Sequence, residues 1–210
     1  MNVRLGVSLW VGILALAMLP SVALADTAAP AVTAGSAALV TSVDGEKLFE
    51  KATTALDRDD LSAALILYVQ AAELNYIPAQ VKLGEFADSS QYYEAAVGWF
   101  LMAAMQGDAA GQYNLGRMYQ SGNGIEKDDA KASYWIRRSA AKNYIPAVKA
   151  LALGYRIGTL GMKVDLEQAN AWDAKAARLD AIETRAINKK LNEFVEAQKK
   201  LKEEAAKKNK

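Results

Sequence analysis

The chain contains no cysteine and no histidine, and it has only four prolines among its 210 residues. Without cysteine it cannot form a disulfide, a thiolate nucleophile or the lipid-modified amino terminus of an exported lipoprotein. Without histidine it cannot build a Ser-His-Asp triad or the common zinc and copper sites. We therefore expect no catalytic residue, no metal site and no cofactor, and a fold that is held together by apolar packing.

The chain also lacks a large net charge, because 25 Lys and Arg residues are balanced by 24 Asp and Glu residues. Proteins that bind nucleic acid usually carry a clear basic excess, so we expect no nucleic-acid partner. The charge is nonetheless segregated along the chain. Residues 181–210 carry nine basic and five acidic groups, whereas residues 26–180 carry fifteen basic and nineteen acidic groups.

The amino terminus has the pattern of a cleavable secretory signal. Arg4 supplies the positive charge, residues 7–19 form an apolar run, and Ala23-Leu24-Ala25 matches the small-x-small cleavage motif. A transmembrane anchor is the alternative, but the apolar run is short and Pro20 follows it. We predict cleavage after residue 25 and a periplasmic or secreted mature protein without a transmembrane anchor.

The chain does contain internal repeats with a period close to 35 residues. One aligned position is occupied by Leu67, Trp99, Trp135 and Trp172, which are spaced 32, 36 and 37 residues apart. The pentapeptide Asn-Tyr-Ile-Pro-Ala also occurs twice, starting at Asn75 and Asn143. Periods of this length are typical of stacked helix pairs. The sequence therefore predicts an all-α fold, a short right-handed α-solenoid of about four helix-turn-helix repeats with a C-terminal amphipathic helix.

The clearest repeat begins at Asp108, which is predicted to cap a helix over residues 109–120. Gly122 and Gly124 then end this helix, since glycine adopts positive φ at little steric cost. The second helix of the repeat has an apolar face in which small residues let the helices approach closely and Trp135 is expected to fill the remaining core volume.

This unit resembles the Sel1-like repeat, a relative of the tetratricopeptide repeat. The resemblance is carried by Leu115-Gly116, Tyr119, Gly122, Gly124, Asp128, Lys131-Ala132, Trp135, Arg138 and Ser139-Ala140. The next unit is similar, with Leu151, Tyr155, Gly158 and Trp172, although Ala152 replaces the usual glycine. The preceding unit keeps Leu83-Gly84 and Trp99 but has Asp88-Ser89-Ser90 in place of the turn glycines. A divergent helix pair over residues 46–74 is expected to cap the amino-terminal end.

These observations divide the chain into four parts: a signal peptide (1–25), a flexible leader (26–43), a repeat domain (44–180) and a basic amphipathic helix with a tail (181–210). In the last part, spacings of four and three residues alternate at Ile187, Leu191, Phe194, Gln198 and Leu201. The first half of this helix is expected to cap the last repeat. Beyond Gln198 a solvated or partner-binding extension is predicted, and peripheral contact with an anionic membrane is weakened by the interspersed glutamates.

The resemblance implies a scaffold for protein interactions rather than an enzyme. In a solenoid of helix pairs the first helices line the concave side, so their polar residues outside the packing face are candidates for partner binding. The candidates are Val81, Glu85, Tyr113, Arg117, Gln120, Lys149 and Arg156. The alternative for each is an ordinary solvated position. The expected partner is another protein of the bacterial cell envelope or a secreted protein.

Two other functions stay open. A cell-wall-associated enzyme active on peptidoglycan or β-lactams would need two carboxylates roughly 5–10 Å apart across a cleft. Asp59-Asp60 and Asp128-Asp129 are available, but both pairs lie at predicted helix starts, where capping accounts for them. The third reading is a tethering protein whose C-terminal helix docks on a partner or a lipid surface while the repeats hold cargo.

Overall fold

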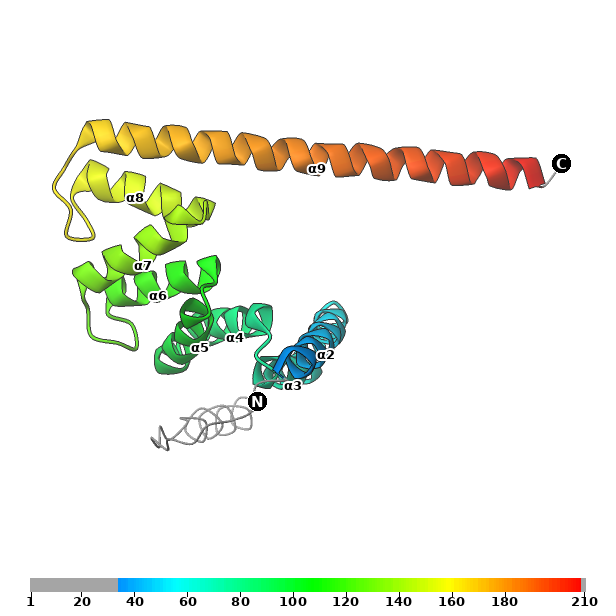
Figure 1. Cartoon of the computed structure of the whole chain (residues 1–210), viewed down its shortest axis with the longest axis horizontal. Helices are drawn as coiled ribbons and strands as arrows, with labels where there is room; N and C mark the ends of the chain where they lie inside the picture. The colour runs from blue at the N-terminus through cyan, green and yellow to red at the C-terminus, as the bar shows by residue number, and fades with distance from the viewer. Residues whose placement is uncertain (1–33, 209–210) are drawn as a thin grey trace, which may run out of the picture. The chain divides into compact units, whose positions relative to one another are not determined.

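The computed structural model describes residues 34–208, which form α-helices joined by short connections (Figure 1). The helices in this part of the chain are α2 (Ala34–Leu56), α3 (Leu61–Glu73), α4 (Ile77–Ser89), α5 (Tyr93–Met105), α6 (Ala109–Ser121), α7 (Asp129–Ala141), α8 (Ile145–Ile157) and α9 (Leu166–Lys208). The predicted all-α architecture of paired helices is confirmed. The predicted signal peptide lies outside the described residues, and helix α2 begins at Ala34, inside the segment that we expected to be a flexible leader.

The helices form two compact units, each built from neighbours in the sequence. In the first unit, which ends at Asp128, α2 packs on α3, α3 on α4, α4 on α5 and α5 on α6. In the second unit, which begins at Asp129, α7 packs on α8 and α8 on α9. None of the helices described here is long and apolar enough to cross a membrane.

The repeated pentapeptides connect one helix to the next. Asn75 and Asn143 adopt φ of 59° and 62°, which ends the preceding helix in the left-handed region that asparagine tolerates. The next three residues of each pentapeptide place a tyrosine at the N-cap and an Ile-Pro pair at the start of α4 and α8. Proline fits there because its missing N–H would have no partner within the helix. Between α5 and α6, Gly107 has positive φ and ends the first helix. Asp108 caps the second helix, because its carboxylate accepts from the Gly111 N–H at 2.7 Å. The predicted Asp108 cap is confirmed.

The turn glycines of the clearest repeat are required for two different reasons. Gly122 is the C-cap of α6 with φ of 76°. Gly124 also has positive φ, and a Cβ there would overlap the backbone carbonyl of Tyr93 at the start of α5. The preceding repeat lacks glycine in its turn, and Gln91 takes the left-handed conformation instead, with the Tyr92 N–H donating to the Ala87 carbonyl at 2.8 Å.

The core is built on small residues at one aligned position of each second helix. Ala64, Ala96, Ala132 and Ala169 are fully buried. The first helices contribute buried leucines at Leu83, Leu115 and Leu151, together with buried Gly84 and Gly116. A Cβ at Gly84 would overlap the ring of Phe100, so glycine makes room for an aromatic ring from the neighbouring helix. In the fourth repeat the residues aligned with this pair are Ala152 and Asp173.

The tryptophans lie less deeply than we predicted. Trp99, Trp135 and Trp172 are all half-buried, whereas the residue that follows the first two, Phe100 or Ile136, is among the most deeply buried large side chains. Successive residues on a helix point about 100° apart, so this one-residue shift moves the deepest layer away from the indoles. The indoles therefore lie at the edge of the buried face. Tyr119 and Tyr155, the tyrosines that carry the Sel1-like resemblance, are half-buried as well.

Helix α9 continues without interruption past residue 180, where the repeat pattern ends (Figure 1). Its first part packs on α8 through buried Ala169 and Ala176. Every side chain from residue 181 to residue 204 is exposed. The expectation that the first half of the amphipathic segment caps the last repeat is therefore wrong. The helix is no longer covered by α8 where the apolar stripe begins, at Ile187.

Candidate protein-interaction surface

In the first unit, one predicted binding residue on α6, Arg117, contacts helix α4, which carries two others, Val81 and Glu85. The guanidinium of Arg117 on α6 lies 3.7 Å from the carboxylate of Asp88 on α4, and it donates to the Asn114 side chain at 3.2 Å. Glu85 and Arg117 are exposed, and Glu85 pairs with Lys82 at 2.8 Å on the same helix. We call this region the α4–α6 surface; its members are Val81, Glu85, Asp88, Tyr113, Arg117 and Gln120, of which Val81, Asp88, Tyr113 and Gln120 are half-buried.

In the second unit the two predicted binding residues are engaged within the chain. Lys149 pairs with Asp180 at 2.9 Å, and Arg156 pairs with Asp173 at 2.5 Å, so both cations join α8 to α9. All four side chains are about half exposed, and such pairs contribute at most about 1 kcal/mol each. These contacts give Lys149 and Arg156 a packing role, and their use by a partner stays a prediction.

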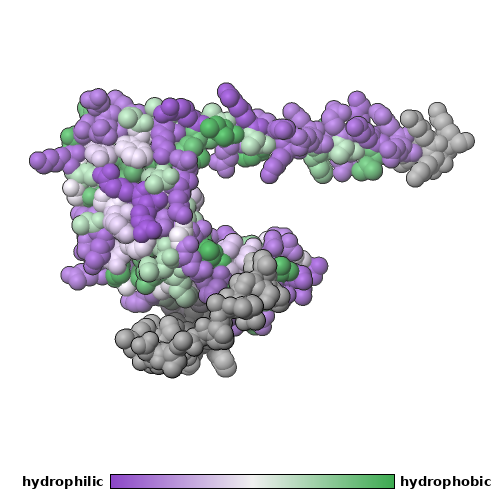
Figure 2. All heavy atoms as spheres, in the orientation of Figure 1, coloured by the Kyte–Doolittle hydropathy of each residue, from purple (hydrophilic) through white to green (hydrophobic). Residues whose placement is uncertain are grey.

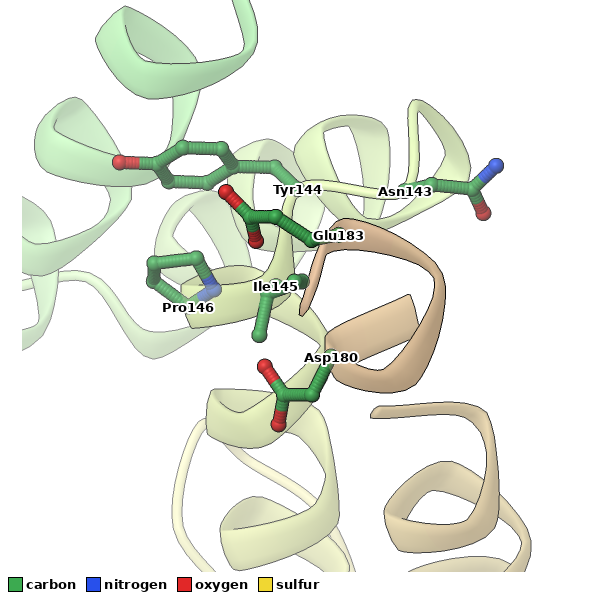
Figure 3. Close-up of a pocket in the computed structure, with 6 residues that line it drawn as sticks. All are labelled: Asn143, Tyr144, Ile145, Pro146, Asp180 and Glu183. Carbon is green, nitrogen blue, oxygen red and sulfur yellow. The ribbon is translucent and has the colours of Figure 1, made fainter. Parts of the chain in front are cut away.

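A hollow of about 490 Å³ lies where the connection between α7 and α8 meets α9 (Figure 3). Its lining includes two carboxylates, Asp180 and Glu183, and Ile145 lies between them. Both acids come from one turn of α9 and therefore form one wall of the hollow. Asp180 is also held by Lys149. This is not the arrangement of two acids facing each other across a cleft that glycoside hydrolysis requires.

The acidic pairs noted in the sequence lie at turns and helix starts. Asp60 is the N-cap of α3 and accepts from the Ala63 N–H at 3.0 Å, and Asp59 closes the turn before it with φ of 60°. Asp129 lies in the first turn of α7, and the backbone N–H of Asp128 donates to the Tyr119 carbonyl at 2.9 Å. Within residues 34–208 no group of three or more His, Cys, Asp or Glu side chains is placed to hold a metal ion.

Helix α7 carries an aromatic cluster that is not among the predicted binding residues. The rings of Tyr134 and Trp135 meet edge to face with centroids 5.1 Å apart. Arg138 lies 5.6 Å from the centroid of each ring and donates to the Tyr134 hydroxyl at 2.7 Å. Tyrosine, tryptophan and arginine dominate the energetics of many protein interfaces. The signal was the spacing Tyr134-Trp135-Arg138, which places an arginine one helical turn after both rings.

The family model for the Sel1 repeat matches residues 47–76, 77–108, 109–144 and 149–180. The chain belongs to the Sel1 repeat family. The four matched segments agree with the predicted number of repeats. Sel1 repeats generally mediate protein interactions, and proteins built from them are typically non-catalytic adaptors.

Proteins similar to this Sel1 repeat protein differ in length and come from both yeast and bacteria. A curated relative is the chitin synthase regulator SKT5 of Saccharomyces cerevisiae, 31% identical over 137 residues, which are 62% of this chain and 19% of that protein. The crystal structure of a Sel1 repeat protein from Oxalobacter formigenes is 31% identical with a TM-score of 0.59, covering 64% of this chain and 58% of the other. A protective antigen of uropathogenic Escherichia coli is 28% identical with a TM-score of 0.60, covering 70% of this chain and 33% of the antigen. The chain thus spans about a fifth of the curated relative.

Proposed function

We propose that this Sel1 repeat protein is a non-catalytic adaptor of the bacterial cell envelope that binds another protein on the α4–α6 surface. The observation that carries the proposal is the run of four consecutive Sel1 repeats. A relative that is named as a regulator of an enzyme, chitin synthase, is consistent with a regulatory or organising role. The envelope location rests on the secretory signal pattern of residues 1–25.

The α4–α6 surface is suited to a partner that offers both charges. Arg117 lies too far from Asp88 for a short hydrogen-bonded pair, so part of its five-donor guanidinium stays available to a carboxylate or a carbonyl of a partner. Tyr113 and Gln120 lie beside it on α6 and can supply an aromatic contact and a hydrogen-bonding amide. A mixed surface of this kind recognises a folded protein rather than an apolar peptide.

Crosslinking in the envelope fraction, followed by recovery of the tagged protein, tests the proposal. Arg117→Glu should reduce the crosslinked partner at least about tenfold, because a buried charge-assisted contact typically contributes more than 1.4 kcal/mol. Arg178→Glu is the matched control, since it reverses an exposed arginine on α9. The proposal fails if the wild-type protein recovers no partner. It also fails if Arg117→Glu and Arg178→Glu retain the partner equally.

A third variant separates the α4–α6 surface from the α7 cluster. Tyr134→Ala removes the exposed ring while leaving the buried neighbours Ala132 and Ile136 in place. If this substitution abolishes recovery and Arg117→Glu does not, the partner binds α7, and the α4–α6 assignment is wrong. Amino-terminal sequencing of the mature protein tests export separately, with the first residue expected close to Asp26.

The carboxylate enzyme is the less favoured alternative. Its best location is the hollow at Asp180 and Glu183, where the two acids share one wall. Turnover of purified muropeptides that is lost in Asp180→Asn or Glu183→Gln would favour this alternative over the adaptor.

A further inference from the structure

The part of α9 beyond the repeats carries large apolar side chains that are exposed in the described structure. Ile187, Leu191, Phe194 and Leu201 are exposed by 58%, 55%, 60% and 59%. In Figure 2 hydrophobic patches alternate with hydrophilic residues along this extension. Isolated exposed leucines are ordinary, but four large apolar residues on one stripe of a helix indicate a surface that is covered by something else.

The spacing of this stripe is that of a coiled-coil seam. Ile187, Phe194 and Leu201 are seven residues apart and occupy one core position of a heptad, the d position. Leu191 and Gln198, also seven residues apart, occupy the other core position, a. Ile182 is equally exposed, at 62%, but lies at position f on the side opposite the seam. The regular repeat of 3.5 residues favours a helix as the occupant, because two such stripes interlock along their length.

The charges on this segment argue against a membrane surface as the occupant. Residues 181–204, which hold the stripe, carry six Lys or Arg and five Glu and are therefore nearly neutral. The basic excess of residues 181–210 comes from Lys207, Lys208 and Lys210, which lie beyond the stripe. Attraction to anionic lipid requires a strongly basic polar face. The occupant that the charge pattern favours is a second copy of the same helix.

The flanking charges select an antiparallel arrangement. When Leu191 faces Leu201 of the second copy and Phe194 faces Gln198 of the second copy, the flanking positions bring Lys190 beside Glu204 of the second copy. Two-fold symmetry repeats this ion pair, so the register contains it twice. A parallel pair would place Lys190 beside Val195 and Lys202 beside Ala197, without any opposite charge.

We infer that this Sel1 repeat protein forms a homodimer through an antiparallel coiled coil of the α9 extension, in which residues 188–204 of the two copies face each other. The inference does not depend on the proposed envelope partner. It would give the adaptor two copies of its repeat surface, so that a partner with two binding sites is held by avidity without any new contact. The seam is short, about two and a half heptads, and Gln198 places an amide at one of its core positions, so the dimer dissociates on dilution.

Sedimentation of the full-length protein over a range of concentrations is the first test. The wild-type protein should change from monomer to dimer with rising concentration. Phe194→Asp should weaken the dimer about 100-fold, because it places a charge in the seam. Ile182→Asp introduces the same charge on an equally exposed residue outside the seam and should leave the dimer unchanged. A protein that is monomeric at every concentration, or a dimer that both variants weaken equally, overturns the inference.

A charge exchange tests the orientation. Lys190→Glu alone creates repulsion between two glutamates in the antiparallel homodimer, and Glu204→Lys alone creates repulsion between two lysines. A mixture of the two variants restores both ion pairs, so the heterodimer should form at lower concentration than either homodimer. In a parallel coiled coil mixing should bring no advantage, and that result would overturn the antiparallel register.

The absence of cysteine makes a distance measurement simple, because a single introduced cysteine is the only labelling site. Spin labels on Arg185→Cys should be offset by about 33 Å along the axis of the antiparallel pair, and should lie side by side in a parallel pair.

Sedimentation with anionic phosphatidylglycerol vesicles tests a membrane surface as the occupant of the stripe. Binding to vesicles that Phe194→Asp abolishes, in a protein that stays monomeric, would show that the stripe serves a membrane and would overturn the dimer.

Discussion

The two parts of helix α9 place apolar residues in opposite ways. Up to residue 180 the buried positions are small, with Ala169 and Ala176 against α8, and the helix backbones approach closely. Beyond residue 180 the apolar residues are large and exposed, with Phe194 and Leu201 as examples. The first pattern is a packed helix–helix interface within one chain. The second pattern has the apolar composition of such an interface, but no other helix of the described structure covers it.

Two phenylalanines provide the strongest test of this comparison. Phe100 is 1% exposed and fills the space beside Gly84, so Phe100→Ala should lower the free energy of unfolding by about 3–5 kcal/mol. Phe194 is 60% exposed, and Phe194→Ala should leave the stability of the dilute protein within about 0.5 kcal/mol of wild type. Urea unfolding followed by circular dichroism measures both. A large loss in the second variant at low concentration would show that the extension packs within its own chain.

Two glycines give the next largest effect. Gly124→Ala forces a left-handed residue to carry a Cβ against the Tyr93 carbonyl and should cost about 2–4 kcal/mol. Gly98 lies inside α5 with no atom near its missing Cβ, so Gly98→Ala should be neutral or should stabilise by up to about 1 kcal/mol. Thermal unfolding of the two variants checks the difference. Equal effects would mean that the turn relaxes around the new methyl group.

The ion pairs that join α9 to α8 should contribute much less. Asp173→Asn removes the charge that pairs with Arg156, and because both side chains are about half exposed the loss should be about 0.5–1 kcal/mol. The difference from wild type should shrink in 1 M salt, where exposed pairs are screened. A salt-independent loss of several kcal/mol would instead indicate a buried packing role for Asp173.

The smallest effect concerns alkaline pH. Burial, together with the nearby carboxylates of Glu46 and Glu50, raises the pKa of Tyr76 above its usual 10.0. The folded state therefore favours the neutral phenol, so this contribution to stability is complete below pH 10 and is lost as the pH rises through the raised pKa. Tyr76→Phe should reduce the loss of stability above pH 10. Identical alkaline unfolding of the variant and the wild-type protein would contradict this assignment.

Much of the local structure was predictable because it depends on a few adjacent residues. The cap at Asp108, the helix ends at the paired Asn-Tyr-Ile-Pro-Ala segments and the turn at Gly122 all follow from backbone preferences. The turn at Gln91 was not predictable from composition, because a residue without special preference is forced into the left-handed region by the closure of the helices around it.

The candidate binding residues depend on neighbours that are distant in the sequence. Lys149 and Arg156 looked like free cations on an exposed face, but the acids that engage them, Asp180 and Asp173, lie 31 and 17 residues further along the chain. The cluster of Tyr134, Trp135 and Arg138 is local and could have been found from its spacing. The same spacing also predicts a core position for Trp135, and this reading hides the cluster.

The sequence by itself determined the repeat, the helical class, the turns and the apolar stripe of the carboxyl-terminal segment, because each follows from a period or from a short-range preference. Only the tertiary structure decided which residues lie deepest. A helical period locates a face to within one residue, and the neighbouring helix then selects Phe100 over Trp99. It also decided that the stripe of α9 is exposed, because burial depends on where the helix axis runs, and no local preference specifies that direction.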